Sequence, residues 1–202
     1  MTFAKGTSTM FITIKKLTPA LAEDFLTYFD HDAFADHEEW AGCYCLESHL
    51  SRDSAPPLDN KQTRREKAKE LILSGVMTGY LLYDENKVVG WCNAGDKSTY
   101  GPVCAFDQLY TLDPQAHNIF IVYCIDIAAD YRGKGLATLA VQRALEDAKA
   151  QGYAFAEGYP FSPGGESDVQ QYPYTGPKRL YEKLGFTLIK QGELFQVMQK
   201  AL

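Results

Sequence analysis

Residues 124–138 read CIDIAADYRGKGLAT, an apolar strand that runs into a glycine-rich turn and then into a helix. The first amides of a helix have no intrahelical acceptor, and the helix dipole places partial positive charge at the same end, so an anion is stabilised there. Gly133 and Gly135 carry no Cβ and let the backbone approach a ligand closely. Arg132 and Lys134 add positive charge beside these amides. The stretch therefore predicts a phosphate-binding turn.

The spacing of the glycines separates this turn from two other phosphate-binding turns. A mononucleotide P-loop has four residues between its first glycine and a Gly-Lys-Ser/Thr sequence, which this turn lacks. A dinucleotide fingerprint needs a third glycine where this chain has Thr138, although Glu157 stands about twenty residues on, where a ribose-binding acid is expected. About 45 residues follow Glu157, too few for the further βα units of a dinucleotide fold.

The turn matches the pattern Arg-x-x-Gly-x-Ala from Arg132 to Ala137, after a strand end at Ile125 and Ile127. This pattern resembles the acyl-CoA-binding motif of the GNAT family of N-acetyltransferases. Residues 178–186 read KRLYEKLGF, which is similar to the Leu-Tyr-x-Lys-x-Gly-Phe helix end of the same family. The two motifs follow one another in the expected order, and they directly cover residues 118–190.

The resemblance implies an α/β fold: a mixed, mainly antiparallel sheet flanked by helices, with a splayed parallel strand pair that holds the pantetheine arm of acetyl-CoA. Acetyl-CoA is the implied co-substrate. Backbone groups at Ile125 and Ile127 would bind the pantetheine amides, and the amides that lead into the helix would hold the diphosphate. The implied cofactor-binding residues are Ile125, Asp126, Ile127, Arg132, Gly133, Lys134, Gly135, Leu136, Ala137 and Thr138.

Acetyl transfer to an amine requires a neutral nucleophile, a polarised thioester carbonyl and a proton for the departing thiolate. The resemblance offers Tyr181 as the proton donor, since a phenol with a pKa of about 10 suits that role; a packing role is the alternative. A strand amide near Ile127 would polarise the carbonyl. Histone-acetylating members carry a glutamate base where this chain has Ile121. Asp126, Glu157 and a water held by backbone carbonyls remain as bases, and Glu157 is the first to test; a solvent-facing strand-end acid is its alternative.

Residues 30–57 form an acidic, aromatic-rich insert that is expected to be ordered and to shape the acceptor site. Its carboxylates would attract a cationic amine, and rings such as Phe34 would close over the apolar part of the amine or take a cation on a ring face. A solvated acidic surface over a small aromatic core is the alternative. Neutralising Asp36, Glu38 and Glu39 together is expected to raise the KM for the amine and not that for acetyl-CoA. The predicted acceptor-binding residues are Trp40, Tyr44 and Glu38.

Hydrophobic periodicity and turn residues predict the remaining elements. The section between the second hairpin strand and the central strand is poorly patterned. No internal repeat or low-complexity tract occurs. The predicted strands are 10–16, a hairpin of 78–83 and 88–93, a central strand 119–127 with 153–157 as its parallel partner, and a final hairpin of 187–190 and 194–199; the predicted helices are 19–29 with Thr18 as N-cap, 61–73, 136–151 and 178–184.

The composition is typical of one globular domain, residues 1–202, since 46% of the residues are hydrophobic and 13% aromatic. A net charge of -6 without a sustained Lys/Arg block argues against sequence-independent binding of nucleic acid. No apolar run has the length of a membrane span and no signal layout opens the chain, so a cytoplasmic protein without a membrane partner is expected. The oligomeric state stays open, a homodimer included.

Five cysteines, an odd number, predict reduced thiols. Cys43 and Cys45 with His37 and His49 nearby could offer metal ligands, but their spacing is tighter than in common zinc sites and no second cysteine pair follows, so no metal is predicted. The function implied is acetyl-CoA-dependent transfer of an acetyl group to a primary amine of a small molecule or peptide, directly in a ternary complex. The alternative is a catalytically inactive CoA-binding sensor or interaction protein. The five cysteines are Cys43, Cys45, Cys92, Cys104 and Cys124.

Overall fold

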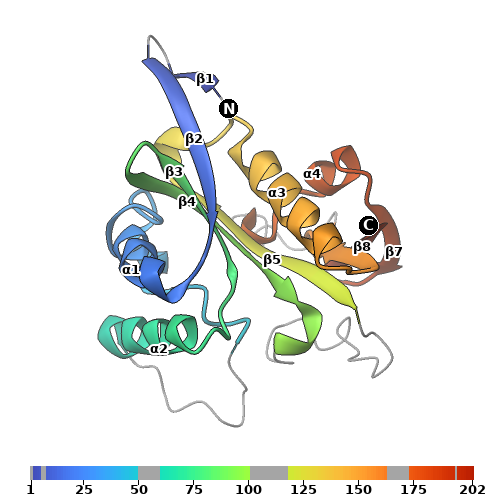
Figure 1. Cartoon of the computed structure of the whole chain (residues 1–202), viewed down its shortest axis with the longest axis horizontal. Helices are drawn as coiled ribbons and strands as arrows, with labels where there is room; N and C mark the ends of the chain where they lie inside the picture. Colours follow the sequence, from blue (N-terminus) through green and yellow to red (C-terminus); the bar gives the residue numbers. More distant parts are fainter. Residues whose placement is uncertain (1, 6–7, 50–59, 101–117, 163–172, 194) are drawn as a thin grey trace.

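The computed structural model describes residues 2–5, 8–49, 60–100, 118–162, 173–193 and 195–202. Their strands form an eight-stranded sheet in the order β1-β2-β3-β4-β5-β6-β8-β7 (Figure 1). Every neighbouring pair is antiparallel except β5 and β6, which run parallel, so the predicted mixed and mainly antiparallel sheet is confirmed. The strands are β1 (Thr2–Lys5), β2 (Ser8–Lys16), β3 (Gly79–Asp84), β4 (Lys87–Asp96), β5 (Ile119–Ile127), β6 (Phe155–Gly158), β7 (Thr187–Gln191) and β8 (Gln196–Ala201).

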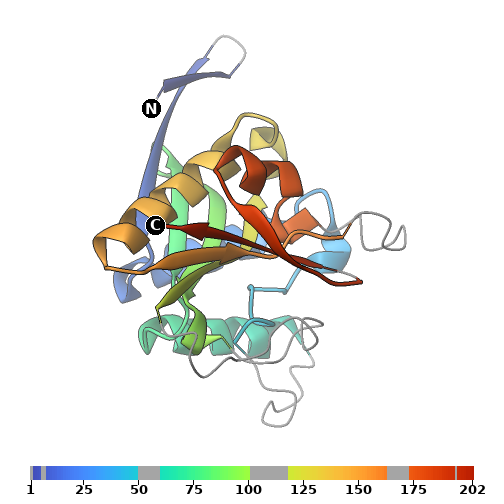
Figure 2. The same ribbon diagram turned by 90° about the vertical axis from the view of Figure 1, so that its right-hand side faces the viewer.

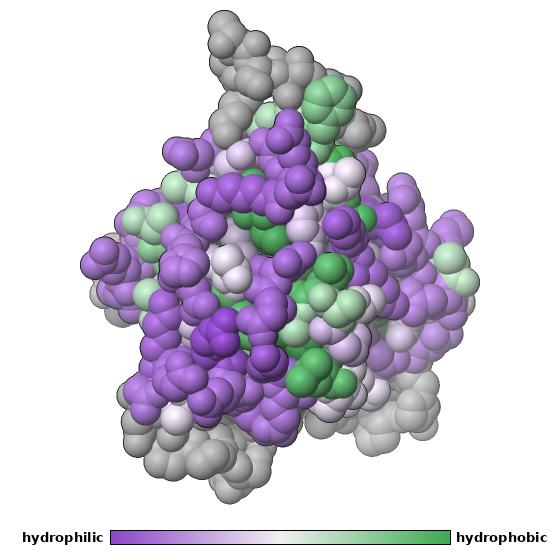
Figure 3. All heavy atoms as spheres, turned by 60° about the vertical axis from the view of Figure 1, so that its left-hand side comes forward, coloured by the Kyte–Doolittle hydropathy of each residue, from purple (hydrophilic) through white to green (hydrophobic). Residues whose placement is uncertain are grey.

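Four α-helices occur in this part of the chain, together with short 3-10 turns. In Figure 1, α1 and α2 lie together at the left, α3 crosses the sheet, and α4 lies at the right with β7 and β8. In Figure 3 the face that carries α1 and α2 is mostly polar, with a small apolar group near its middle. The helices are α1 (Ala22–His31), α2 (Lys61–Leu73), α3 (Leu136–Ala150) and α4 (Lys178–Lys183); the 3-10 turns are η1 (Pro19–Leu21), η2 (Glu38–Trp40), η3 (Lys97–Thr99), η4 (Ala129–Tyr131) and η6 (Pro173–Thr175).

Most predicted elements are confirmed, two of them, α2 and β5, with the predicted bounds. The helix predicted for 19–29 begins with η1. Thr18 occupies its N-cap position, as predicted, but makes no side-chain capping hydrogen bond. Strand β1, which pairs with β2, was not predicted. The final hairpin is shifted toward the C-terminus, and β8, not β7, lies beside β6. Cys104 and residues 50–57 of the insert lie outside the described residues.

Helices α1 and α3 cover opposite faces of the sheet. The ring of Trp91 in β4 packs edge-on against Phe25 of α1, with 4.9 Å between ring centroids. The neighbouring Cys92 points the other way, because side chains alternate along a strand. Its cross-strand partner Tyr80 bonds Asp147 of α3. The sheet is therefore covered on both faces where β3, β4 and β5 run side by side, as in Figure 2.

The parallel pair separates halfway along β5. Its register runs from Ile119 opposite Phe155 to Val122 opposite Gly158 and stops there. From Tyr123 to Ile127, β5 therefore has no partner on its β6 side among the described strands. This separation is the splayed strand pair that the resemblance implied, and it leaves a backbone edge open in the middle of the sheet.

Gly158 makes the separation sterically possible, because a Cβ at that position would lie 2.1 Å from Cε1 of Tyr181. We expect Gly158→Ala to push this buried ring out of place and to cost about 1–3 kcal/mol of unfolding free energy, the usual cost of overpacking. Urea denaturation measures this loss. An unchanged midpoint of unfolding would show that the ring is free to move.

Candidate active site

The turn before α3 has the shape that an anion site requires. Gly133 and Gly135 adopt φ angles of +74° and +82°, which side chains other than glycine rarely adopt. A Cβ at either position would meet no heavy atom of the described residues within 4 Å, so the space above the turn is open. Because the N-cap is Gly135, that residue offers no side chain to the first amides of α3. The residues present therefore fit a diphosphate.

The two cations of the turn are engaged with protein groups, which the sequence did not predict. The Arg132 guanidinium makes a bidentate ion pair with Asp36, at 2.5 and 3.1 Å, and donates from Nε to the Ile127 carbonyl at 2.8 Å. These contacts hold the pKa of Asp36 below its usual range. The Lys134 ammonium donates to the Asp130 carbonyl. The ion pair thus ties the insert to the phosphate turn.

A cavity of about 830 Å³ lies beside the open edge of β5. One wall is β5 itself, another is the insert, and α2 contributes polar side chains. Most of the lining surface is apolar or aromatic. The wall residues of β5 are Tyr123, Cys124, Ile125, Asp126 and Ile127; those of the insert include Phe34, His37, Glu39, Trp40, Cys43, Cys45 and Glu47; Lys61 and Arg64 come from α2, and Phe29, Asn60, Arg132 and Tyr174 also line the cavity.

One of the three predicted acceptor-binding residues lines this cavity. Trp40 does, and its ring stacks on His37 with 4.0 Å between centroids. Tyr44 is instead fully buried against Phe29 and is part of the core, which corrects that prediction. Glu38 is exposed and lines a separate, smaller hollow. The sequence predicted Glu38 at the acceptor site, but a position in a short turn does not show in which direction the side chain points.

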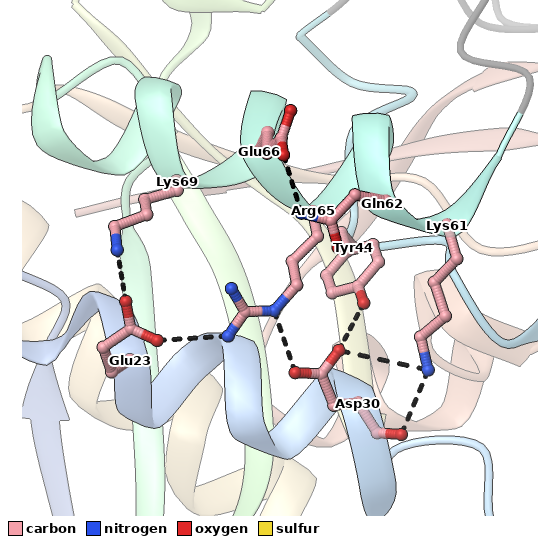
Figure 4. Close-up of polar contacts among 8 residues, drawn as sticks. All are labelled: Glu23, Asp30, Tyr44, Lys61, Gln62, Arg65, Glu66 and Lys69. Carbon is pink, nitrogen blue, oxygen red and sulfur yellow. Dashed lines mark hydrogen bonds and ion pairs between the residues drawn. The ribbon is translucent and has the colours of Figure 1, made fainter.

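Hydrogen bonds between α1 and α2 hold the insert in place (Figure 4). The Asp30 carboxylate accepts from the Tyr44 hydroxyl and from Arg65 Nε, the latter at 2.9 Å. Arg65 also reaches Glu23 at 3.1 Å. Lys61 donates to the Asp30 carbonyl at 3.2 Å. These contacts tie Tyr44 of the insert to the end of α1 and, through Asp30, to α2.

Asp126 is the buried acid of the cavity. Its side chain points toward α1, where the Tyr28 hydroxyl donates to Oδ1 at 2.5 Å. Burial raises the pKa of Asp126 to about 6, against the opposing effects of that hydrogen bond and of the Arg132 charge. A carboxyl with such a pKa is mostly ionised at neutral pH and more basic than an ordinary aspartate, which suits a general base.

Glu157, the acid predicted as the first base to test, is buried in a different place. It accepts from Lys97 Nζ at 2.7 Å, from the Tyr159 hydroxyl at 2.7 Å and from Gln199 at 3.0 Å. It is 2% exposed and is not among the described residues that line the cavity. The solvent-facing alternative is therefore wrong, because three donors hold this carboxylate inside the sheet, whereas a catalytic role of Glu157 stays a prediction.

Tyr181 lies where β5 and β6 separate. Gly176 lies between Ile125 of β5 and Tyr181. A Cβ built on this glycine would be 3.2 Å from Cδ1 of Ile125 and 3.4 Å from Cε2 of Tyr181. The Tyr181 hydroxyl donates to the Thr175 carbonyl at 2.5 Å. Burial, together with nearby Cys92 and Cys124, raises the pKa of Tyr181 well above its ordinary value. The phenol is therefore protonated and stands beside the strand predicted to hold pantetheine.

Two site residues were missed by the sequence analysis. Tyr123 forms a bulge in β5, since the register opposite β4 passes from Cys124 directly to Val122, and its ring lines the cavity. Asn93 is fully buried and accepts from Tyr100 at 2.6 Å, which turns its amide nitrogen toward the insert. A polar residue inside an otherwise apolar strand was a signal for Asn93, whereas nothing in the sequence marks the bulge.

Within the described residues, no group of three or more His, Cys, Asp or Glu side chains is arranged to hold a metal ion. The four cysteines described there, Cys43, Cys45, Cys92 and Cys124, are free thiols. No helix in the same part of the chain combines the length and the apolar character that crossing a membrane requires.

A splayed strand pair that ends in an open phosphate turn defines the class of acyl-CoA acyltransferases. A family profile described as "Acetyltransferase (GNAT) family" matches residues 17–163. The chain therefore belongs to the GNAT acetyltransferase family, whose members use acetyl-CoA. No curated protein matches the sequence.

Solved structures with the same fold include several acetyltransferases. A GNAT acetyltransferase from Streptococcus pneumoniae aligns with a TM-score of 0.53 at 16% identity, over 95% of this chain and 100% of that one. A mosquito arylalkylamine N-acetyltransferase like 5b aligns with a TM-score of 0.58 at 15% identity, over 95% and 100%. The PaiA N-acetyltransferase of Thermoplasma acidophilum, in complex with coenzyme A, aligns with a TM-score of 0.54 at 15% identity, over 96% and 100%. At these identities the likeness is one of fold.

The ion pair between Asp36 and Arg132 changes the result expected from neutralising the insert. Asp36→Asn removes a negative charge next to the phosphate turn and releases the Arg132 guanidinium. We therefore expect the Kd for coenzyme A to fall about 3- to 10-fold, equivalent to roughly 1 kcal/mol. Calorimetric titration measures it, with Glu38→Gln, which removes an exposed acid of the same turn, as the matched control. Equal Kd values for Asp36→Asn and the wild type would contradict this role.

Proposed function

We propose that this protein transfers an acetyl group from acetyl-CoA to a primary amine of a small molecule or peptide, directly in a ternary complex. The observation that carries the proposal is that one strand segment serves two sites. Residues 123–127 of β5 are the open edge that leads to the phosphate turn and also one wall of the cavity. A thioester laid along this edge would face an acceptor in the cavity.

The proposed roles follow from where the residues lie. The amides from Gly133 to Thr138 hold the diphosphate, and the backbone at Ile125 and Ile127 binds the pantetheine amides. Asp126 takes the proton of the amine, because it lines the cavity and Glu157 does not. Tyr181 gives a proton to the departing thiolate, since its phenol stays protonated beside the same strand.

The charge of the cavity favours an amine carried on an apolar body. Each cation in its wall already has an acidic partner: Arg64 pairs with Glu47 at 2.8 Å, Arg132 with Asp36 at 2.5 Å, and Lys61 reaches Asp30 at 3.9 Å. Asp126 instead accepts only from a neutral phenol among the contacts described. An ammonium group would compensate this carboxylate, and the aromatic rings would cover the rest of the acceptor. The free thiols suit a reducing compartment, and we place the protein in the cytoplasm.

A panel of aromatic amines, aliphatic amines, amino acids and peptides, incubated with acetyl-CoA while released thiol is measured, tests this proposal. We expect turnover with apolar primary amines and little with acidic acceptors. The alternative of an inactive CoA-binding sensor predicts heat of binding with coenzyme A in a calorimeter but no thiol release with any acceptor. The absence of measurable binding of coenzyme A would contradict both.

A further inference from the structure

Two thiols face each other in the wall of the cavity. Cys45 comes from the insert and Cys124 from β5, and both line the cavity. The amide nitrogen Nδ2 of Asn93 lies 3.0 Å from the Cys45 sulfur. Asn93 is also the cross-strand partner of Cys124, so the two side chains stand next to each other on one face of the sheet. The Cys45 sulfur is therefore held against β5 at the position of Cys124.

The groups around Cys45 favour its thiolate form. Burial alone would raise its pKa, but the neighbouring Cys124 thiol, Asn93 amide and Trp91 indole favour the thiolate, outweigh burial and lower the pKa of the Cys45 thiol. The same contact and burial raise the pKa of Cys124 well above its ordinary value. The fully buried Trp91 indole nitrogen meets no acceptor within ordinary hydrogen-bond distance among the described residues, so its N–H remains for an anionic sulfur. Cys45 is thus the nucleophile of the pair, and the Cys124 thiol donates a hydrogen bond to its sulfur.

The loop that carries Cys45 is fixed, not merely folded over the sheet. Tyr44 and Cys45 both adopt left-handed backbone angles, with φ of 46° and 52°, an arrangement that L residues adopt at a cost. The Tyr44 hydroxyl bonds Asp30, and Ser48 donates to the Cys45 carbonyl at 3.2 Å. These contacts keep the sulfur in one place relative to β5.

The acetyl group would lie beside this sulfur if the proposed function is correct. Pantetheine would run back from the phosphate turn along Ile127 and Ile125, and the next residues of the same edge are Cys124 and Tyr123. One residue of a strand covers about 3.3 Å, so the thioester that follows the two pantetheine amides reaches the bulge at Tyr123. This is the point where Cys45 faces the cavity.

We propose that Cys45 is a second acyl acceptor of this cavity and becomes S-acetylated by bound acetyl-CoA when no amine is present. The Cys45 sulfur attacks the acetyl carbonyl and a new carbon–sulfur bond forms. The bond between the acetyl carbon and the coenzyme A sulfur breaks, and coenzyme A leaves as a thiol with the proton that Cys45 gave up. One thioester replaces another, so the step needs no oxidant or other co-reactant. The inference rests on the proposed position of the cofactor.

Intact-protein mass spectrometry after incubation with acetyl-CoA alone tests the inference. We expect a gain of one acetyl group per chain, removed by neutral hydroxylamine as a thioester is, and located on Cys45 by peptide mapping. Cys45→Ser should lose the hydroxylamine-sensitive adduct. Cys43→Ala is the matched control, because Cys43 lines the same cavity on the same loop but burial raises its pKa to about 12. This variant should keep the adduct.

The outcomes separate this inference from the proposed function. An adduct on Cys43 or Cys124, or no adduct in a protein that binds coenzyme A and acetylates amines, would overturn the role of Cys45 and leave the proposed function intact. No binding of coenzyme A in a calorimeter would overturn both. Peptide mapping of the wild-type protein decides the question even if Cys45→Ser does not fold.

Discussion

Asp126→Asn is expected to lower kcat by about 10²- to 10⁴-fold, the usual contribution of a general base. In the wild type, kcat/KM should fall on the acid side with an apparent pKa of about 6, which is the pKa that burial gives this carboxyl. The variant should lose this acid limb. Stopped-assay rates across a pH series measure both effects. A variant with wild-type rates, or with the same pH profile, would show that Asp126 is not the general base and would favour a bound water in that role.

The same substitution should make the protein more stable at alkaline pH. The pKa of Asp126 is about 6 in the folded protein and 3.8 in an unperturbed aspartate, so the folded state binds the proton more tightly. Stability is therefore lost as the pH rises through this interval, by up to about 3 kcal/mol. Asn carries no charge at any pH and still accepts from Tyr28. Denaturation should show the variant gaining little at pH 3, about half of the full gain at pH 5 and the full gain at pH 8.

Tyr28→Phe provides a matched test of the assignment. The Tyr28 hydroxyl is the hydrogen-bond donor to Asp126, and this bond lowers the pKa of the carboxyl. Its removal should move the acid limb of the kcat/KM profile to higher pH and keep most of the rate at alkaline pH. A residue that only packs the core would not move the limb.

Tyr181→Phe is expected to lower kcat by about 10²-fold or more and to leave the Kd for coenzyme A unchanged. The phenol is the proton donor that the thiolate needs, and its raised pKa keeps it protonated. Loss of its hydrogen bond to the Thr175 carbonyl should cost only about 1 kcal/mol of stability. Pre-steady-state thiol release and calorimetry measure the two quantities separately.

Tyr159→Phe is the control for Tyr181→Phe. Tyr159 is also almost fully buried and its hydroxyl also makes one hydrogen bond, to Glu157 at 2.7 Å. If both variants lose the same fraction of kcat, loss of a buried hydroxyl explains the effect and the catalytic role of Tyr181 is wrong. If neither loses activity, the thiolate is protonated by another group.

The sequence predicts those parts of the fold whose pattern is local. Strand β5 and helix α2 were found with their bounds, because a continuous apolar run and a run rich in Lys, Arg, Glu and Leu that stops near Gly75 carry their own signals. The resemblance supplied the splayed pair. Strand β1 and the bulge at Tyr123 were missed, since one depends on pairing with β2 and the other on the register opposite β4.

The site was predicted less well because its contacts join distant residues. The pairing of Arg132 with Asp36 spans 96 positions, and no local pattern announces it. Glu157 stands at a strand end, where the sequence does not say which face the side chain takes; Lys97, 60 positions away, holds it inside. Tyr44 was assigned to the acceptor as an aromatic residue of the insert, but its left-handed backbone turns the ring into the core. The assigned roles themselves stay predictions.

Among the described strands, none pairs with β5 on its β6 side between Tyr123 and Ile127. An unpaired strand edge is a template on which another strand can add; here η6 lies against β5 and covers part of that edge. A pantetheine arm laid along that edge would act as a surrogate strand and cap it. Bound coenzyme A would then also stabilise the folded protein. At a hundred times its Kd it adds about 2.7 kcal/mol to the free energy of unfolding. The protein free of coenzyme A would therefore be less stable than the saturated one by this amount.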